Sequence, residues 1–216
     1  MCYDSIVFDN DGVLTYPTPQ AVLQQGVKDA FSRFDITPDD DLVTKMVDAD
    51  VTQIQQVARR YNVAPSVLWE QREKSVAAAQ RRALEDGTKT LYEDVSTLES
   101  LHAPMGIVSN NQHETVLSIV ELFELRELFP YATGREPTLD GFQRRKPNPD
   151  YLTDALDSIG VSSGLYVGDS NVDILAADRA GMDVAFIRRP HRTAYELVAE
   201  PTYEINSLEE LASIAV

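Results

Sequence analysis

The sequence contains a single cysteine and no long apolar run. Because Cys2 has no partner, no internal disulfide can hold the fold together. No segment approaches the roughly 18 to 20 consecutive apolar residues that a membrane-spanning helix needs. The first residues also lack the basic and apolar parts of a signal peptide. We therefore expect a soluble, cytoplasmic protein without a membrane partner.

Positive charge is also scarce. Lys and Arg total 19 against 35 Asp and Glu, which gives a formal net charge of −16. A surface of this sign repels phosphate backbones, so we expect no nucleic-acid partner. An excess of carboxylates with few lysines resembles the composition of halophilic proteins, whose self-repulsion is screened at high salt. An ordinary acidic cytosolic protein is the alternative interpretation.

Short apolar runs separated by helical patterns are the main feature of the rest of the chain. The runs predict buried parallel strands at residues 5–9, 105–109, 164–169 and 184–187. Helical patterns lie at 114–125, 149–159 and 171–180, and a short strand and helix are expected within 201–216. This alternation predicts an α/β fold with a Rossmann-like doubly wound parallel sheet.

The segment from residue 17 to residue 87 breaks the alternation. It contains no convincing strand, and its apolar residues recur at helical spacing. A proline at position 65 begins a long helical pattern there. We predict an all-helical domain of about four helices at 17–87, inserted into a core domain that comprises 1–16 and 88–216.

Groups that can handle phosphate or metal follow the predicted strands. In open parallel sheets, ligands bind at the carboxyl ends of the strands, near the point where the strand order reverses. Asp9, Ser109 and Asp169 end three of the predicted strands. We therefore expect these residues, which are far apart in the sequence, to meet in one crevice.

The first group is the pair Asp9 and Asp11. At an extended strand end, carboxylates at i and i+2 point the same way, and their repulsion raises a pKa unless a cation compensates. The pair therefore suits a divalent-metal site or a nucleophile with a proton donor. A calcium loop is excluded, because the further ligand positions hold Val13, Thr15 and Gln20.

The second group is Ser109 and Asn110. A hydroxyl and free backbone amides after a buried strand can hold a phosphoryl oxygen. Seen alone, the same residues could equally form a turn that caps the helix expected near residue 114.

The third group is Lys146, which is followed by Pro147 and Pro149. The prolines restrict the backbone, so they would hold the ammonium in place, where it can neutralise a transferring phosphoryl group. A basic solvated loop is the alternative.

The fourth group is Asp169 and Asp173. Their spacing places one carboxylate at a strand end and the other in the first turn of the next helix, where both can reach one small hard cation. Capping of that helix is the alternative interpretation.

In this order, the four groups resemble the signature motifs of the haloacid dehalogenase-like hydrolase superfamily. The matching stretches are Asp9-Asn10-Asp11-Gly12-Val13, Ser109-Asn110, Lys146-Pro147-Asn148-Pro149 and Gly168-Asp169-Ser170-Asn171-Val172-Asp173. The resemblance extends from Ser5 to about Ile187. It is greatest to the phosphoglycolate phosphatase and β-phosphoglucomutase subgroup, and the segment 17–87 resembles the type-one helical cap of that subgroup.

The resemblance implies a role for each catalytic and phosphate-binding residue. Asp9 would attack phosphorus and form an aspartyl-phosphate. Asp11 would protonate the leaving oxygen and then activate the hydrolytic water. Ser109 and Asn110 would bind the phosphoryl oxygens, and Lys146 would neutralise their charge.

The resemblance also implies Mg²⁺ as cofactor. The ion would lie between the Asp9 carboxylate, the main-chain carbonyl of Asp11 and the Asp169 carboxylate. Asp173 would support this shell directly or through water.

The function implied is a Mg²⁺-dependent phosphatase for a small phosphomonoester, such as phosphoglycolate or a sugar phosphate. Asp11 favours phosphate-ester chemistry, because dehalogenases of the superfamily need no acid at that position. A phosphosugar mutase is the first alternative, although Tyr16 stands where such mutases commonly have an acid. A non-catalytic binding protein is the second. The expected partner is a small phosphorylated metabolite, and the protein is expected to be a monomer or a homodimer.

Overall fold

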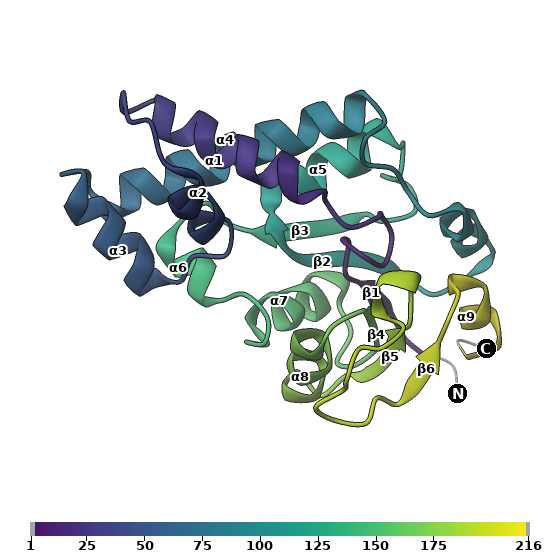
Figure 1. Cartoon of the computed structure of the whole chain (residues 1–216). Helices are drawn as coiled ribbons and strands as arrows, with labels where there is room; N and C mark the ends of the chain where they lie inside the picture. Colours follow the sequence, from purple (N-terminus) through teal and green to yellow (C-terminus); the bar gives the residue numbers. More distant parts are fainter. Residues whose placement is uncertain (1–2, 215–216) are drawn as a thin grey trace.

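The computed structural model describes residues 3–214, and its centre is a sheet of six parallel strands (Figure 1). The strand order is β3-β2-β1-β4-β5-β6. The strands are β1 (Ile6–Phe8), β2 (Met105–Gln112), β3 (Tyr131–Arg135), β4 (Leu165–Gly168), β5 (Asp183–Ile187) and β6 (Tyr203–Ile205). This architecture confirms the α/β prediction.

β3 is the strand that the sequence analysis missed. It lies at one edge of the sheet, and four of its five residues are only partly buried. An edge strand of this kind needs no continuous apolar run, so the run-based signal did not reach it. By contrast, β1, β4 and most of β2 are buried on both faces, which made them visible in the sequence.

Helices cover both faces of the sheet. They are α5 (His113–Leu122), α7 (Asp150–Ile159), α8 (Asn171–Arg179) and α9 (Leu211–Ile214), with 3₁₀ turns at Glu93–Ser100, Pro190–Arg192 and Leu208–Glu210. The short α6 (Leu139–Gln143) packs instead against the helices of residues 20–85. Ile6 and Phe8 point toward the face that α5 and α9 cover, while Val7 points toward α7 and α8. Each such fully buried side chain contributes about 1.5–3 kcal/mol to folding. No helix within residues 3–214 is long and apolar enough to cross a membrane.

Four helices connect β1 to β2: α1 (Gln20–Ser32), α2 (Asp40–Val47), α3 (Val51–Arg60) and α4 (Pro65–Glu85). They share a hydrophobic cluster, which includes Phe31, Met46, Ile54 and Trp69 and is joined by Phe142 of α6. α1 packs closely on α4, where a Cβ on Gly26 would lie 2.6 Å from the Val76 Cα. The segment 17–87 thus contains four α-helices, while its standing as a separate domain stays a prediction.

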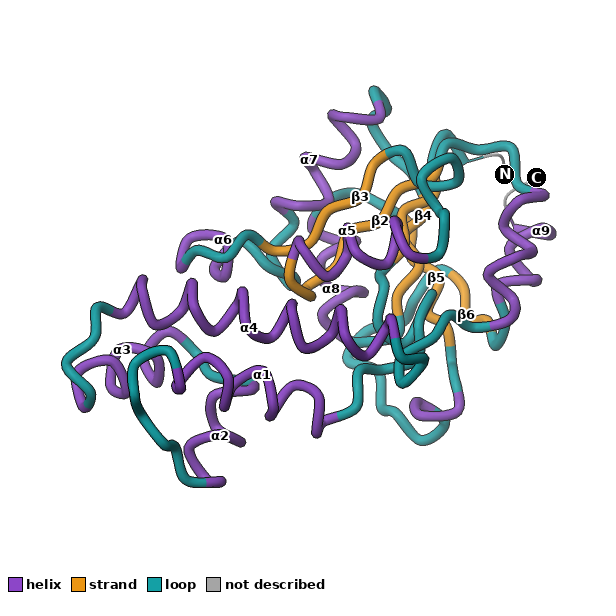
Figure 2. The backbone as a smooth tube through the Cα atoms, turned by 90° about the horizontal axis from the view of Figure 1, so that it is seen from above, coloured by secondary structure: helices purple, strands orange, loops and turns teal. Residues whose placement is uncertain are grey.

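Two segments join these helices to the sheet, and they are hydrogen-bonded to each other. Tyr16 N donates to Thr90 O at 3.0 Å, and Tyr92 N donates to Leu14 O at 2.9 Å. Figure 2 shows α1–α4 beside the sheet, with α4 running next to α5. The entry and exit of the helical segment are therefore held together, directly beside the loop that follows β1.

A buried ion pair also joins α4 to the edge of the sheet. Glu73 of α4 is 1% exposed, and its two carboxylate oxygens accept from Arg135 Nε at 2.6 Å and Arg135 Nη2 at 2.9 Å. Arg72 Nη1 binds the same carboxylate, and Gln112 Nε2 donates to it at 3.2 Å. One buried carboxylate thus serves two guanidinium groups between α4 and the ends of β2 and β3.

Candidate active site

The chemically active groups gather where three neighbouring strands end. Asp9 directly follows β1, Ser109 lies in β2, and Asp169 directly follows β4. β1 pairs with both other strands, and Asp9 N donates to Val167 O at 2.9 Å. The side chains are buried, with 8%, 3% and 3% of each residue exposed. The structure thus brings together the three residues that the sequence placed at strand ends.

Asp9 is a buried carboxyl group among other charges. Burial raises its pKa to about 7; Lys146 opposes the shift, whereas Asp173 and Asp169 add to it. Its Oδ1 accepts a hydrogen bond from Asn10 N at 2.7 Å. The ionised form that a nucleophile needs is therefore favoured only when positive charge is added nearby.

Lys146 supplies one such positive charge. It is buried, with 2% of the residue exposed, and its Nζ lies 3.1 Å from Asp9 Oδ1 and 2.7 Å from Asp173 Oδ1. It also donates to the Tyr166 hydroxyl at 2.5 Å. Burial alone would lower the pKa of Lys146, but Asp173 and Asp9 hold it above its usual value. The lysine therefore stays charged and is not the solvated loop residue of the alternative interpretation.

Asn110 holds the Lys146 loop against the end of β2. Its Oδ1 accepts from Lys146 N at 2.8 Å, and its Nδ2 donates to Lys146 O at 2.9 Å. The neighbouring Ser109 Oγ accepts from Asn111 N at 3.2 Å. The predicted role of Asn110 concerned phosphate, whereas its side chain is used here to position the lysine, which sequence alone did not indicate.

Asp173 has two functions at once. As the third residue of α8, its Oδ2 accepts from Ser170 N at 3.0 Å and Asp169 N at 3.2 Å, and Ser170 Oγ completes a capping box. Its Oδ1 faces Lys146. The capping alternative is therefore realised, and the same carboxylate also lies beside Asp9 and Asp169.

Asp169 is held by residues that follow β5. His191 Nε2 lies 2.7 Å from Asp169 Oδ2, and Arg192 Nε donates to the same oxygen at 2.9 Å. The sequence gives no reason to place His191 at a site, because its spacing to the other histidines matches no metal site. The order of the strands places His191 at the site, and no local motif indicates this position.

Gly12 is required where the loop after β1 passes Asp169. Its φ is +84°, and a Cβ there would lie 2.8 Å from Asp169 Cγ and 2.9 Å from His191 Nε2. Gly12→Ala should therefore combine backbone strain with displacement of Asp169. We expect a stability loss of roughly 1–3 kcal/mol in urea unfolding.

Gly160→Ala is the matched control for this prediction. Gly160 has the same φ of +84°, but no atom lies within 4 Å of the Cβ that it would gain. It should lose stability through strain alone, and therefore less than Gly12→Ala in the same urea unfolding measurement. Equal losses in the two variants would contradict the crowding of Asp169 by residue 12.

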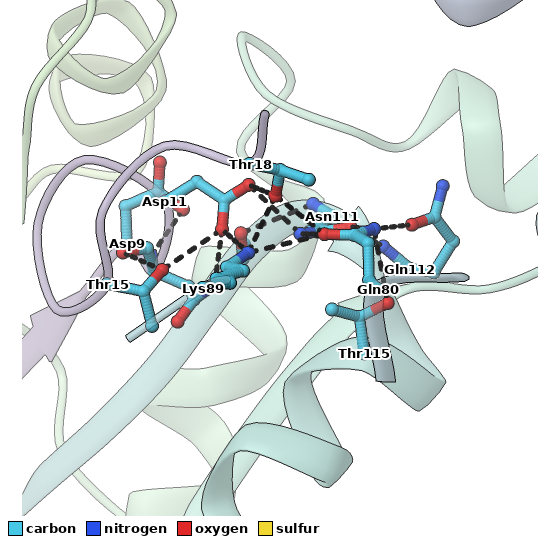
Figure 3. A network of polar contacts seen from close by, with 11 residues as sticks. Asp9, Asp11, Thr15, Thr18, Gln80, Lys89, Asn111, Gln112 and Thr115 are labelled. Carbon is cyan, nitrogen blue, oxygen red and sulfur yellow. Dashed lines mark hydrogen bonds and ion pairs between the residues drawn. The ribbon is translucent and has the colours of Figure 1, made fainter. Parts of the chain in front are cut away.

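The Asp11 side chain turns toward the helical segment instead of toward Asp9 (Figure 3). Its Oδ1 accepts from Asn10 Nδ2 at 2.7 Å and from the Lys89 ammonium. Its Oδ2 accepts from Thr18 Oγ1 at 2.9 Å and Asn111 Nδ2 at 3.1 Å. Sequence analysis did not identify Lys89, because a single lysine in a polar stretch carries no pattern.

Asp9, Asp169 and Asp173, termed the acidic trio, fit a divalent cation. One oxygen of each lies within 4.8 Å of the others. Magnesium prefers such oxygen ligands, and a cation here would offset the repulsion that raises the pKa of Asp9. The Asp11 carboxylate is not part of the trio; the ligand expected from Asp11 is its main-chain carbonyl, and that role stays a prediction.

Comparison with known proteins gives matches at the level of family, sequence and fold. Residues 6–187 match the family model described as haloacid dehalogenase-like hydrolase. Over 127 residues, 57% of each chain, the sequence is 31% identical to the pyrophosphatase PpaX of Halalkalibacterium halodurans. Over 97 residues it is 39% identical to the phosphoglycolate phosphatase of Aliivibrio fischeri, covering 42% of this chain and 41% of the relative.

The chain thus spans about half the length of the curated relatives it matches. Among solved structures, CbbY from Rhodobacter sphaeroides in complex with phosphate has a TM-score of 0.70 at 18% identity. That similarity covers 97% of this chain and 96% of the other. It shows the fold over almost the whole chain.

Proposed function

Since the chain belongs to the haloacid dehalogenase-like hydrolase family, we propose that it is a Mg²⁺-dependent phosphatase acting on a small phosphomonoester. The observation that carries the proposal is the buried Asp9 carboxyl group, which lies beside the Lys146 ammonium and two further carboxylates. This arrangement suits a nucleophile that works beside a cation. The names of the similar phosphatases support the same class of reaction.

In the proposed mechanism, an Asp9 oxygen attacks phosphorus and the bond to the ester oxygen breaks. Asp11 gives its proton to the departing oxygen, and an aspartyl-phosphate remains on Asp9. Asp11 then takes a proton from water, which attacks phosphorus and releases inorganic phosphate. Such reactions depend mainly on positioning and on charge stabilisation.

The remaining residues bind and neutralise the phosphoryl group. Lys146 is charged, and its Nζ lies 3.1 Å from Asp9 Oδ1, so it can stabilise the negative charge that Asp9 and the phosphoryl oxygens share. Ser109 and the Asn110 amide are proposed to hold phosphoryl oxygens. When bound by the acidic trio, Mg²⁺ would neutralise further charge on the phosphoryl group.

We assign the helical segment 17–87 the role of a cap that excludes water and selects the substrate. Contacts between α4 and the end of β2 support this role. Gln80 Nε2 donates to Asn111 Oδ1 at 2.8 Å and to Gln112 Oε1 at 2.7 Å. We also propose that the protein works in a cytoplasm of high salt concentration, and the net charge of −16 supports this.

The test is phosphate release from p-nitrophenyl phosphate, phosphoglycolate, sugar phosphates and inorganic pyrophosphate. Pyrophosphate is included because of the similarity to PpaX. Each assay compares Mg²⁺ with EDTA, at low and at high KCl. We expect turnover that requires Mg²⁺, rises with KCl and is accompanied by acid-stable phosphate label on Asp9.

Two outcomes would contradict the phosphatase proposal. Transfer of the phosphoryl group to form a bisphosphorylated sugar, without phosphate release, would identify a mutase. Mg²⁺ binding by a folded protein that turns over no phosphoester or pyrophosphate would identify a non-catalytic binding protein.

A further inference from the structure

Lys89 is a buried lysine outside the four sequence motifs. Only 1% of the residue is exposed, and its ammonium group faces oxygens of Asp11, Thr18 and Gln80 (Figure 3). The distances are 2.7 Å to Thr18 Oγ1 and 3.2 Å to Gln80 Oε1. An ammonium group has three donors, so these three oxygens satisfy it completely.

Packing alone does not explain a charged group at this position. Burial of an ammonium group is unfavourable unless it is paired and hydrogen-bonded, and an apolar side chain could fill the same space. The carboxylate that compensates Lys89 belongs to Asp11, the proposed acid and base. The charge is therefore placed where it controls the direction of a reacting group.

The backbone fixes where this ammonium group can lie. Lys89 N donates to Ala83 O of α4 at 2.8 Å, and the next residue, Thr90, is hydrogen-bonded to Tyr16. Lys89 therefore stands in the segment that leads from the helical segment back to the sheet. Its position relative to Asp11 is set by α4 and by the loop after β1 together.

Gln80 of α4 joins the same network from the side of the cap. It is completely buried, and its Oε1 accepts from Asn111 Nδ2 at 2.9 Å as well as from Lys89. Asn111 in turn donates to Asp11 Oδ2 at 3.1 Å. The Asp11 carboxylate is thus held on both oxygens by groups that Gln80 orients.

We propose that Lys89, oriented by Gln80, is a positioning residue that directs the Asp11 carboxyl group toward the leaving oxygen. This inference rests on the proposed phosphatase function. Acid catalysis contributes roughly 10²–10⁴-fold, and a displacement of about 1 Å can cost roughly 10²-fold. Loss of Lys89 should therefore lower kcat/KM, which reports the steps up to departure of the leaving group, for substrates whose leaving oxygen must be protonated. It should spare kcat/KM for substrates that need no proton.

The experiment compares Lys89→Met with wild type on an alkyl phosphate and on p-nitrophenyl phosphate. Methionine keeps the unbranched chain and removes the charge. We expect kcat/KM to fall roughly 10²-fold for the alkyl ester and to change little for the aryl ester, whose leaving group departs without a proton. Lys28→Met, which removes an exposed lysine paired with Asp40, should leave both values unchanged.

Two further variants keep the test decisive. Combined with Asp11→Asn, Lys89→Met should cause no additional loss, because it acts through Asp11. If Lys89→Met does not fold, Gln80→Leu should show the same dependence on the leaving group. Circular dichroism and Mg²⁺ titration establish that each variant is folded.

The outcomes separate the positioning role from the function on which it rests. Equal losses for both esters, or no loss for either, would overturn the role of Lys89 while leaving the phosphatase proposal standing. Absence of turnover by the folded wild type on every ester would overturn both.

Discussion

Asp9→Asn should abolish phosphate release, with a loss of at least roughly 10⁴-fold in kcat. An amide nitrogen or oxygen cannot form the aspartyl-phosphate, and no other carboxylate of the acidic trio is placed to replace it. Asp173 is held by the capping box and Lys146, and Asp169 is held by His191 and Arg192. Phosphate release and acid-stable labelling measure the two steps. Retention of more than a few per cent of the activity would exclude Asp9 as the nucleophile.

The same substitution should stabilise the metal-free protein at alkaline pH. The pKa of Asp9 is about 7 in the folded protein, against a usual value of 3.8, because of burial. For a raised pKa, the folded state holds the proton more tightly. The stabilisation is therefore fully present below about pH 4 and is lost as the pH rises through 7.

Asparagine removes this dependence on pH. With about 1.4 kcal/mol for each pKa unit, the metal-free wild type should lose a few kcal/mol between pH 5 and pH 8 that Asp9→Asn keeps. Urea unfolding in EDTA measures the difference, and Mg²⁺ should reduce it by stabilising ionised Asp9. A difference between the two proteins that is the same at both pH values would show that Asp9 is already ionised without metal.

Glu73→Ala should lower the free energy of unfolding by about 3–5 kcal/mol, which is more than the loss expected for Gly12→Ala. It leaves Arg72 and Arg135 buried without their carboxylate, at the contact between α4 and the sheet edge. Glu70→Ala is the control on the same helix, because its pair with Lys74 is exposed and should contribute less than about 0.5 kcal/mol. Chemical unfolding measures both.

The effect of Glu73 should disappear in acid. Burial alone would raise its pKa, but Arg135 and Arg72 outweigh burial and hold the pKa below its usual value. For a lowered pKa, the stabilisation is present above the usual value of 4.5 and is lost as the pH falls through the lower one. A stability difference between wild type and Glu73→Ala that persists at strongly acidic pH would contradict the ion-pair explanation.

Sequence patterns predicted the parts of the fold that obey a local rule. β1, β2, β4 and β5 were predicted because burial on both faces requires an apolar run. The meeting of Asp9, Ser109 and Asp169 was predictable because parallel strands end at the same edge.

The parts that were missed depend on contacts between distant segments. Lys89 reaches Asp11 only because the entry and exit of the helical segment are paired. His191 reaches Asp169 only because β5 lies next to β4 in the sheet. A single lysine or histidine has no periodicity or spacing to reveal such a contact.

The central position of β1 in the sheet has a consequence for how the chain folds during synthesis. Ile6 pairs with Met105 on one side and Leu165 on the other, so about half of the chain must be synthesised before the first neighbour of β1 exists. The helices of residues 20–85 pack against one another through contacts between residues that are closer in the sequence, so these helices can form first. The ribosome therefore releases Asp9 early, but its surroundings are complete only after β4 and α8 have emerged.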